Sequence, residues 1–518
     1  MTSDMKSKSG DFVIKNALLS VSNKQGIQAF AKSLTRYGCL LYSTGGTGRT
    51  LHDADIPYTE LSDYTGFPDL MDGRVKSLHP LVHGGILSRR NMDGTVTKRH
   101  GITEFDLVVA NLYPFAETVR RADCTWEDAI ENIDVGGPAM IRAAAKNNDH
   151  VLVVIDPDDY TEVCLRIEGA RVDRDYRRRM AARAFQYTAL YDSNVANFLA
   201  SSKSFPETLL LLYKQESQLR YGENPHQKAA MYVRGSDAAS ARQIQGKQLS
   251  FNNIADSDSA IECVLAFEAP ACAIVKHGNP CGVAIGLDAT DAYIQAYSTD
   301  PTSAYGGIVA FNVPLQADAL RHVIENQFVE VVIAPSVDSD AIELAQSRKN
   351  LRLLEVTGTD AGDGELQFKQ VLGGLLVQEK DAKDFSADDL ECVTHRKPTS
   401  EERRDLRFAW QVARYVKSNA IVLAKEQRTI GIGAGQMSRV VSARIASMRA
   451  QEEGLDKNGC VMASDAFFPF RDGVDSAAKN GVTAVIQPGG SIRDGEVIEA
   501  ANDHGMAMLF THMRHFRH

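Results

Sequence analysis

The sequence predicts an α/β protein of more than one domain. The chain has 518 residues, and at roughly 150 residues per domain this length suggests about three domains. Short apolar runs alternate with amphipathic stretches along the chain, which is typical of a doubly wound, parallel sheet with helices between its strands. Hydrophobic residues make up 44% and charged residues 24% of the chain. These fractions are ordinary for globular proteins and exclude a disordered chain.

In the first part, apolar runs at 17–21, 39–42, 107–110 and 151–155 are the predicted strands, and 26–34 is a predicted helix. They favour a parallel sheet, because helical patterns separate the strands.

A second helical pattern, residues 172–200, carries five arginines. Such a stretch is usually a solvated helix face or a helix that joins domains. The polar, proline-containing break at 201–206 follows it. We therefore predict two main parts, residues 1–203 and 204–518.

The second part again reads as mixed α/β. Its predicted strands are 271–275, 307–311, 329–334 and 482–486. Polar connectors near 336–365 and 379–402 could separate two lobes, and no tandem repeat at a fixed period is found in the sequence.

Charge and cysteine content exclude several classes of protein. The formal net charge of −10 argues against a protein that coats nucleic acid. No segment approaches the roughly 18 apolar residues of a spanning helix, and no apolar stretch follows the first lysines, so we expect a soluble cytoplasmic protein. The eight cysteines are scattered without a C-x-x-C pair, which favours reduced thiols and no zinc site of that kind.

Two strand ends in the first part carry small and polar residues. Residues 41–48 read Leu-Tyr-Ser-Thr-Gly-Gly-Thr-Gly, and residues 20–24 read Ser-Val-Ser-Asn-Lys. The first segment alone could be a phosphate-binding turn or a plain tight turn, and it is not a P-loop. Carboxyl ends of strands share one crevice in an open α/β sheet. The pair of segments therefore favours a phosphate site formed by Ser22, Lys24, Ser43 and Thr44.

Three further residues of the first part have two readings each. Arg74 and Lys76 point to one side of an extended loop, or they are ordinary exposed charges. Tyr113 follows a strand on the side where ligands bind, or it is a core aromatic.

Paired glycines and a proline at 136–138 open an alanine-rich helix. They place Asp134 near a helix N-terminus. Lys146, about two turns after Pro138, would by this argument complement the dipole at the end of that helix.

In the second part, residues 220–227 read Arg-Tyr-Gly-Glu-Asn-Pro-His-Gln, a density of polar groups that suggests a binding loop. An apolar strand stops abruptly at Lys276 and His277. Beside a charged lysine, His277 could act as a general base, or it could be a structural histidine. Phe467 and Phe468 suit either stacking on a flat heterocycle or core packing.

Taken in order, these segments resemble the bifunctional AICAR transformylase/IMP cyclohydrolase family of purine biosynthesis, and the matching motifs run from Ser20 to the carboxyl terminus. The resemblance implies a methylglyoxal-synthase-like amino-terminal domain that performs the cyclohydrolase step. It implies two cytidine-deaminase-like lobes, a duplication, that perform formyl transfer in the rest of the chain.

The resemblance also implies roles for residues of the first part. The phosphate-binding positions are Ser22, Lys24, Ser43, Thr44, Gly45, Gly46 and Thr47. The positions around base and ribose are Arg74, Lys76, Ser77, Asn111, Tyr113, Asp134 and Val135. Catalysis of ring closure is expected from Lys76, Tyr113, Asp134 and Lys146, and the resemblance gives Lys146 proton transfer instead of the helix-dipole role.

For the second part the resemblance implies that Lys276 and His277 are the catalytic pair, with His277 as the proton acceptor. The nucleotide positions are Arg220, Tyr221, Gly306, Glu330, Asn419, Arg439, Phe467 and Arg514. The positions near the folate are Val440, Asp472, Ser491 and Ile492. Glu330 and His512 depart from the family pattern, which concerns ligand geometry more than activity.

The implied reaction transfers a formyl group from 10-formyltetrahydrofolate to AICAR and then closes FAICAR to IMP. It needs no metal, and the family is typically a homodimer that binds neither nucleic acid nor membrane. One alternative is a zinc nucleoside deaminase, because of Asn279-Pro-Cys281, although the H-x-E element and the C-x-x-C pair are missing. Another is a nucleotide-sensing protein, which leaves some 300 residues of the second part without a role.

Overall fold

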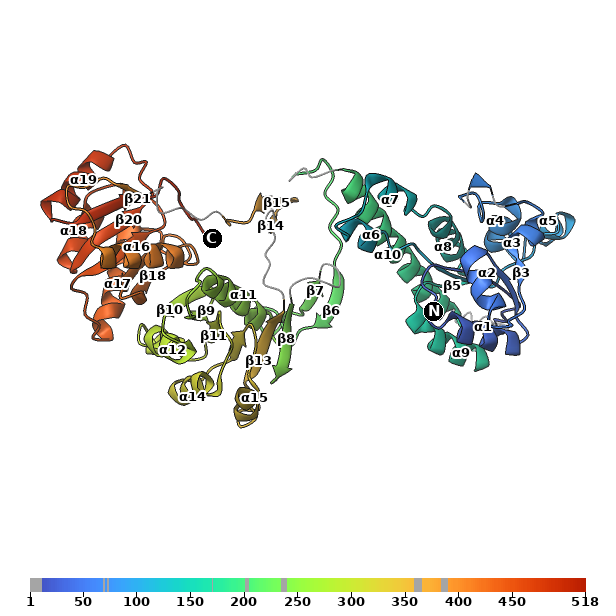
Figure 1. Cartoon of the computed structure of the whole chain (residues 1–518), viewed down its shortest axis with the longest axis horizontal. Coiled ribbons are helices and arrows are strands. Elements are labelled where there is room, and N and C mark those ends of the chain that lie inside the picture. The colour runs from blue at the N-terminus through green and yellow to red at the C-terminus, as the bar shows by residue number, and fades with distance from the viewer. Residues whose placement is uncertain are drawn as a thin grey trace, which may run out of the picture. The chain divides into compact units, whose positions relative to one another are not determined.

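The computed structural model describes residues 12–518 except 69, 72–73, 170, 201–204, 234–239, 358–365 and 383–389. The chain forms two compact units, Met1–Leu212 and Tyr213–His518 (Figure 1), called here the first and the second unit. The predicted boundary at 203/204 lies outside the described residues.

The first unit is built on a five-stranded parallel sheet in the order β3-β2-β1-β4-β5. Its strands are β1 (Asn16–Val21), β2 (Leu40–Ser43), β3 (Thr59–Glu60), β4 (Leu107–Asn111) and β5 (Leu152–Val154). The helices are α1 (Ile27–Arg36), α2 (Gly45–His52), α3 (Leu61–Thr65), α4 (Pro80–Leu87), α5 (Gly94–Arg99), α6 (Phe115–Arg120), α7 (Trp126–Glu131), α8 (Gly136–Lys146), α9 (Tyr160–Glu168) and α10 (Arg174–Leu199), with a 3₁₀ turn η2 (Pro157–Asp159). This confirms the predicted parallel sheet with helices between its strands.

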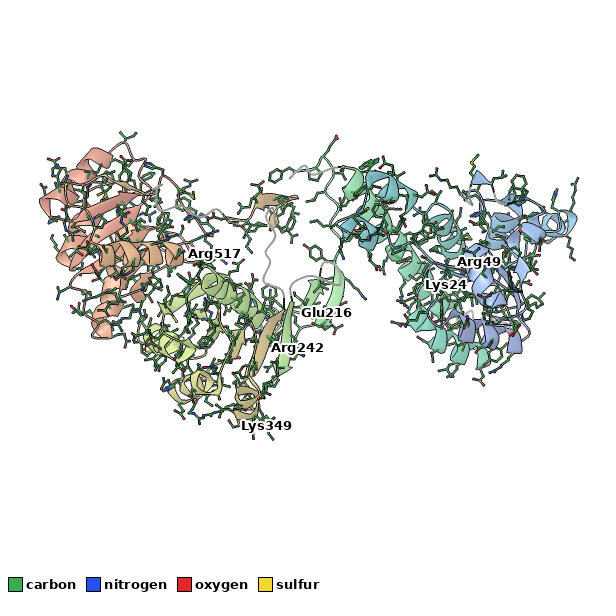
Figure 2. The ribbon with its side chains drawn as sticks, in the orientation of Figure 1. Lys24, Arg49, Glu216, Arg242, Lys349 and Arg517 are labelled. Atoms are coloured by element: carbon green, nitrogen blue, oxygen red, sulfur yellow. The ribbon has the colours of Figure 1, made fainter. Side chains whose placement is uncertain are left out.

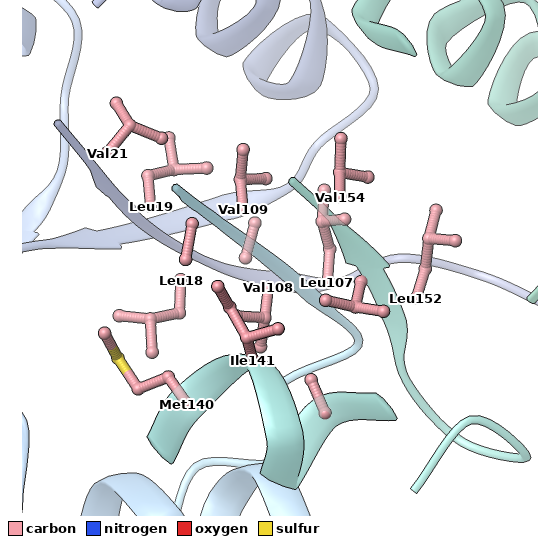
Figure 3. Close-up of a cluster of buried hydrophobic side chains, with 14 of the residues drawn as sticks. Leu18, Leu19, Val21, Leu107, Val108, Val109, Met140, Ile141, Leu152 and Val154 are labelled. Carbon is pink, nitrogen blue, oxygen red and sulfur yellow. The ribbon is translucent and has the colours of Figure 1, made fainter. Parts of the chain in front are cut away.

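The core of the first unit consists of the sheet and the helices laid on it. Leu18 and Val108 of the sheet and Met140 and Ile141 of α8 belong to one buried cluster (Figure 3). Burial of each such side chain contributes about 1.5–3 kcal/mol. Because β1 is the central strand, the carboxyl ends of β1, β2 and β4 lie side by side at one edge.

The arginine-rich helix α10 is more buried than its pattern suggested. It packs on α8 and β5, and the Arg177 guanidinium is buried and donates to the carbonyl oxygens of Asn148 (2.9 Å) and Val172 (2.7 Å). The other arginines lie toward the surface, as expected for a solvated face; Arg174 pairs with Asp149 (2.7 Å).

The second unit contains a twelve-stranded mixed sheet in the order β16-β21-β20-β19-β17-β18-β10-β9-β11-β12-β13-β8. Its strands are β8 (Ser240–Gln245), β9 (Ala271–Lys276), β10 (Asn279–Ile285), β11 (Ile308–Phe311), β12 (Val331–Ala334), β13 (Arg352–Thr357), β16 (Glu391–Cys392), β17 (Ile421–Lys425), β18 (Arg428–Gly433), β19 (Cys460–Ser464), β20 (Val482–Gln487) and β21 (Ala507–Phe510). The helices are α11 (Phe251–Leu265), α12 (Ala289–Tyr297), α13 (Pro301–Ala304), α14 (Ala317–Asn326), α15 (Ser339–Ala345), α16 (Ser400–Ala413), α17 (Arg439–Glu452), α18 (Asp472–Lys479) and α19 (Asp494–Asp503).

The second unit is an internal duplication. In both halves a helix leads into a two-stranded hairpin, a second helix follows, and three parallel strands separated by helices complete the half. We call these halves the first lobe (α11 to β13) and the second lobe (α16 to β21). They meet where β10 pairs antiparallel with β18, so that one sheet runs through both lobes. The two α/β lobes implied by the resemblance are therefore present.

A glycine in each hairpin explains how the following helix can pack so closely. A Cβ atom at Gly282 would lie 2.0 Å from the carbonyl oxygen of Ala296 in α12. A Cβ atom at Gly431 would lie 2.1 Å from the carbonyl oxygen of Ala446 in α17. Only glycine fits at these two equivalent positions.

Most strands of the large sheet either end or begin at one of its edges, as their directions show. At this edge β9, β18, β19, β20 and β21 end, and β10, β11, β12 and β17 begin. We call it the His277 edge, because His277 follows β9 there. The helix α11 begins at the same edge, since it ends at the opposite edge just before β9 starts.

Two further hairpins of the second unit pair outside the large sheet: β6 (Lys214–Gln218) with β7 (Ala230–Val233), and β14 (Leu366–Val371) with β15 (Gly374–Glu379). Across the described ranges, no helix is both long enough and apolar enough to cross a membrane.

Candidate functional site

The N-terminus of α2 in the first unit is surrounded by cationic side chains. Gly45 has φ +44°, and a Cβ atom there would lie 2.5 Å from the Lys76 Nζ. A Cβ atom at Gly46 would lie 3.8 Å from Lys24 Nζ and 3.8 Å from Arg49 Nη2; Figure 2 labels both cations. The glycines thus leave room beside three positive charges at the positive end of a helix dipole, which is a suitable site for an anion.

One of these cations, Lys24, is partly buried. The pKa of Lys24 is lowered, mainly by desolvation and further by the positive charge of Arg49. Its ammonium donates to the carbonyl oxygens of Val21 and Ser22. An anion at this position would offset the repulsion between Lys24 and Arg49.

Several residues of the predicted nucleotide site bind the protein backbone around it. The buried Ser43 hydroxyl donates to the carbonyl oxygen of Leu19 (2.9 Å). The Asn111 Oδ1 accepts from the backbone N–H groups of Ser22 (2.6 Å) and Asn23 (2.8 Å). These two side chains therefore fix the loop after β1, while Thr44 precedes α2 as its N-cap residue.

A second cluster lies at the start of α8. The Asp134 Oδ1 accepts from the backbone N–H of Gly137 (2.8 Å). Burial raises the pKa of Asp134, and hydrogen bonds from the backbone N–H groups of Gly137 and Tyr113 oppose this rise. A Cβ atom at Gly136 would lie 2.6 Å from the Ser77 Oγ. The structure thus brings Ser77, Tyr113 and Asp134 together.

The exposure of the neighbouring residues fits a ligand side. The Tyr113 side chain is 50% exposed and Val135 is 62% exposed, so Tyr113 is not a core aromatic. The exposed Arg74 guanidinium forms an ion pair with Glu131 of α7. This pair places Arg74 beside the segment that leads into α8.

Two tyrosines of α10 that no sequence pattern indicated support this cluster. The Tyr191 hydroxyl accepts from the backbone N–H of Asp134 (2.7 Å) and donates to the carbonyl oxygen of Asn132 (3.0 Å). The Tyr187 hydroxyl accepts from the backbone N–H of Leu112 (3.0 Å). No local pattern links them to Asp134, because they lie more than 50 residues further along the chain.

Lys146 is not brought together with these residues. It is the last residue of α8 and is exposed, whereas Asp134 precedes the first residue of that helix. At 1.5 Å per residue, the helix separates its two ends by about 15 Å. The place of Lys146 suits a cation that complements the helix dipole.

In the second unit, His277 and Gly278 form the two-residue tip between β9 and β10. His277 has φ +56° and Gly278 has φ +71°, as in a type I′ turn. The His277 side chain is exposed at the tip. The Lys276 ammonium donates to the carbonyl oxygen of Tyr305 (2.7 Å), which leaves its other N–H groups for a ligand.

Gly306 and Glu330 lie next to this tip. Gly306 has φ +77°, and its N–H donates to the carbonyl oxygen of Phe328 (2.7 Å). Glu330 pairs with the buried guanidinium of Arg352 (2.7 Å), a residue that the sequence analysis missed. The first lobe thus brings Lys276, His277, Gly306 and Glu330 to one place.

A second group lies in the second lobe. The Arg439 Nη2 donates to Asn419 Oδ1 (2.8 Å), and its Nη1 donates to Ser464 Oγ (2.9 Å) and pairs with the fully buried Asp465. Asp465 was missed, although it directly follows the strand that ends at Ser464. This buried pair orients the Arg439 guanidinium beside Asn419.

The remaining candidates also lie at the His277 edge. Those after β18, β19, β20 and β21 are Val440, Phe467, Asp472, Ser491, Ile492 and Arg514. Phe467 is 40% exposed and Phe468 is 1% exposed, so only Phe468 is a core residue. Arg220 and Tyr221 lie by the start of α11, because Phe251 N–H donates to the Tyr221 carbonyl oxygen (3.3 Å).

The two lobes hold their groups at separate places along that edge. β9 and β19 are four strand positions apart in the sheet, which corresponds to about 19 Å at ~4.8 Å per strand. His277 and Asp465 thus belong to different lobes, and the Lys417 N–H, which donates to Asn279 Oδ1 (2.9 Å), links the hairpin tip to the segment that leads to Asn419. His512 follows β21 at the same edge, where its ring pairs with Glu391 of β16 (2.9 Å).

The donor set does not suit the zinc deaminase alternative. Cys281, the thiol of the Asn-Pro-Cys segment, donates to the Ile274 carbonyl oxygen (3.4 Å), and burial raises its pKa to about 12. A zinc ligand must be a thiolate. Among the residues that the structure describes, no group of three or more His, Cys, Asp or Glu side chains could hold a metal ion.

Fold and sites together define an α/β protein with a cationic cluster at a helix N-terminus in one unit and a hairpin that carries Lys276 and His277 in a duplicated second unit. The family model described as AICARFT/IMPCHase bienzyme matches residues 144–449, and the model of the MGS-like domain matches residues 26–139. The first match covers more than half of the chain, so the chain belongs to the AICAR transformylase/IMP cyclohydrolase bienzyme family. The crystal structure of ForH shares 38% sequence identity over 36% of this chain and 99% of that chain, with a TM-score of 0.33.

Membership of this family makes the protein a bifunctional formyltransferase and cyclohydrolase for the last two steps of purine biosynthesis. The formyltransferase depends on folate, and AICAR and folate are the ligands that the family implies.

Proposed function

We propose that the two reactions are divided between the two parts of the chain, with ring closure in residues 1–203 and formyl transfer in residues 204–518. The observation that carries this division is that each unit has its own cluster of polar residues. One lies around the start of α2 and α8, and the other lies at the His277 edge. An MGS-like match confined to residues 26–139 supports the same division.

For formyl transfer, His277 is the proton acceptor and Lys276 stabilises charge on the formyl oxygen. The amine of AICAR is conjugated with its imidazole carboxamide and is a poor nucleophile, so a base must take its proton. The amine nitrogen attacks the formyl carbon of 10-formyltetrahydrofolate, and His277 receives the proton. The bond from the formyl carbon to the folate nitrogen then breaks, and that nitrogen takes up a proton as tetrahydrofolate leaves. A charged Lys276 beside the tip lowers the energy of the tetrahedral intermediate.

The remaining residues of the His277 edge bind the two substrates in this proposal. Arg220, Tyr221, Gly306, Glu330, Asn419, Arg439, Phe467 and Arg514 hold AICAR, and Val440, Asp472, Ser491 and Ile492 hold the folate. The oriented Arg439 guanidinium and the exposed Phe467 ring support this assignment, because a guanidinium suits a phosphate and a ring suits a flat heterocycle.

Ring closure is intramolecular, so its site mainly holds the reactive conformer and moves protons. The cradle at α2 holds the phosphate of FAICAR, with Ser22, Lys24, Ser43, Thr44, Gly45, Gly46 and Thr47. The carboxamide nitrogen attacks the formyl carbon, and loss of water gives IMP. The buried Asp134, with the neighbouring Tyr113 and Lys76, transfers the protons. A part for Lys146 in proton transfer rests on the resemblance alone. No metal takes part in either proposed reaction.

We further propose that the protein acts as a homodimer. The family resemblance supports this, because members of the family are typically homodimers. The β14–β15 hairpin also supports it: Leu372, Leu375 and Leu376 are exposed on it, and an isolated hairpin is marginally stable in water. Light scattering should give twice the chain mass of 56.7 kDa; a monomer with full activity would contradict the dimer.

A cytoplasmic location is supported by the cysteines. All eight thiols are free, and cysteines of a reducing compartment are not joined in disulfides.

The proposed reactions are tested by incubating the purified protein with AICAR and 10-formyltetrahydrofolate. Tetrahydrofolate release is followed by absorbance and the nucleotide product is identified. IMP is the expected product. Folate turnover that stops at FAICAR would contradict the role of the first unit, and no turnover would contradict the role of the second.

A further inference from the structure

Among the residues that the structure describes, no side chain holds the His277 ring. Within the parts of the chain that the structure describes, its imidazole makes no hydrogen bond to protein, and only its backbone is held. A catalytic histidine is more often oriented by a carboxylate on its ring. The backbone of the hairpin tip therefore sets the point from which this side chain extends.

That backbone is in an unfavourable conformation. His277 has φ +56°, a left-handed conformation that costs a non-glycine residue free energy and persists only where the surroundings impose it. Something outside the two-residue turn must therefore stabilise it.

Asp256 of α11 provides this stabilisation. Its Oδ1 accepts from the Gly278 N–H (2.7 Å) and its Oδ2 accepts from the His277 N–H (3.3 Å). One carboxylate thus holds both N–H groups of the tip. On the other side, Asn279 Oδ1 accepts from the Lys417 N–H (2.9 Å).

The second lobe contains the same arrangement without the histidine. Glu426 and Gln427 form the tip between β17 and β18, with φ +54° and +53°. The Asp405 carboxylate of α16 accepts from both of their N–H groups, at 2.9 and 2.8 Å. The duplication therefore offers a matched control, in which the same contact supports a tip that carries no base.

The equivalence extends to the lysine before each tip. Lys276 Nζ donates to the carbonyl oxygen of Tyr305 (2.7 Å), and Lys425 Nζ donates to that of Asn458 (2.9 Å). Lys425 is in addition paired with Asp456 (2.7 Å). The two tips thus share their framework and differ in the residue at the position of His277.

We propose that Asp256 is a positioning residue for formyl transfer, which holds the hairpin tip so that the His277 ring faces the substrate amine. The inference rests on the proposed role of His277. Misplacement of a reacting group by about 1 Å can cost on the order of a hundredfold in rate. Loss of the contact should therefore lower kcat for formyl transfer and affect AICAR binding little.

The test compares Asp256→Asn with Asp405→Asn. An asparagine offers one acceptor oxygen, so it can keep only one of the two hydrogen bonds. We expect Asp256→Asn to lower kcat for formyl transfer by about ten- to a hundredfold and to leave the KM for AICAR within about threefold. Asp405→Asn should leave kcat within about twofold, and the Tm of both variants is measured alongside. Asp256→Glu, which keeps the charge but moves the acceptor oxygens, should also lower kcat and remains informative if Asp256→Asn does not fold.

Equal losses of kcat in Asp256→Asn and Asp405→Asn would overturn the inference, as would a raised KM with unchanged kcat. Conversion of FAICAR to IMP, measured in the same samples, should be unchanged. Formyl transfer by wild type and its loss in His277→Ala separate the inference from the proposed function. If His277→Ala retains formyl transfer, the role of His277 itself is wrong. If His277→Ala abolishes formyl transfer and Asp256→Asn does not lower it, the positioning role alone is wrong.

Discussion

The Thr47 hydroxyl binds both backbone groups of Val21. It accepts from the Val21 N–H and donates to the Val21 carbonyl oxygen, at 3.0 Å in each case. Thr47 is 2% exposed, so both bonds are shielded from water. They attach the first turn of α2 to the end of β1, the central strand, and so fix the anion cradle between two strand ends.

We expect Thr47→Val to weaken both the fold of the first unit and the nucleotide site. The shape is kept, but the Val21 N–H loses its side-chain acceptor, and the Val21 carbonyl oxygen keeps only the Lys24 ammonium as a side-chain donor. This change should cost about 1–3 kcal/mol of unfolding free energy. Denaturant unfolding measures this loss, and the KM for FAICAR should rise. Thr47→Ser keeps the hydroxyl and should remain within about 1 kcal/mol of wild type. Equal stability of the valine variant and wild type would contradict the role of the two bonds.

Replacement of Asp134 should affect the rate of ring closure and the stability of the protein in opposite directions. Burial raises its pKa in the folded state above the ordinary value of 3.8, so the folded protein binds this proton more tightly than the unfolded chain. Its contribution to stability is therefore complete below the unfolded pKa and is lost as pH rises through the folded pKa.

At neutral pH, Asp134→Asn should consequently have a Tm equal to or above that of wild type, with the difference disappearing below pH ~4. The same variant should lose at least about a hundredfold in the rate of ring closure. Thermal unfolding and FAICAR turnover across pH measure the two effects. A variant that is less stable at pH 7 yet cyclises normally would contradict this account of the carboxylate.

Substitution of Lys146 distinguishes two roles for this residue. The resemblance implies proton transfer, and its position at the end of α8 suggests that it complements the helix dipole. If Lys146 transfers a proton, Lys146→Ala should slow ring closure by about a hundredfold or more, and FAICAR should accumulate from AICAR. Lys146→Arg should fail equally, because a guanidinium does not release its proton. If Lys146 only complements the dipole of α8, the alanine variant should cyclise normally with a slightly lower Tm, and arginine should restore that Tm. We expect the first result.

The sequence was informative where a local pattern defines a strand end. Small residues after an apolar run predicted the start of α2, and the abrupt end of an apolar run at Lys276 predicted that His277 lies at a strand terminus. Neither pattern depends on the rest of the chain. Exposure could not be predicted in the same way, so Tyr113 and Phe467 became distinguishable from core residues only in the structure.

Contacts between distant segments were not predictable. Asp256 binds the hairpin tip because α11 packs on β9, and Tyr191 reaches Asp134 because α10 packs on α8. The residue pattern alone showed no repeat for a related reason, although the family resemblance implied the duplication. The two hairpins share Lys276 and Lys425 and a few glycines, while the loops and helices between equivalent strands differ in length, so no fixed period exists.

The central claim, two reactions at separate sites of one chain, is tested most directly with His277→Ala. Formyl transfer from 10-formyltetrahydrofolate to AICAR and conversion of supplied FAICAR to IMP are measured separately in the same preparation. We expect the first reaction to be lost and the second to proceed at the wild-type rate. A parallel fall of both rates, or undiminished formyl transfer, would contradict the account.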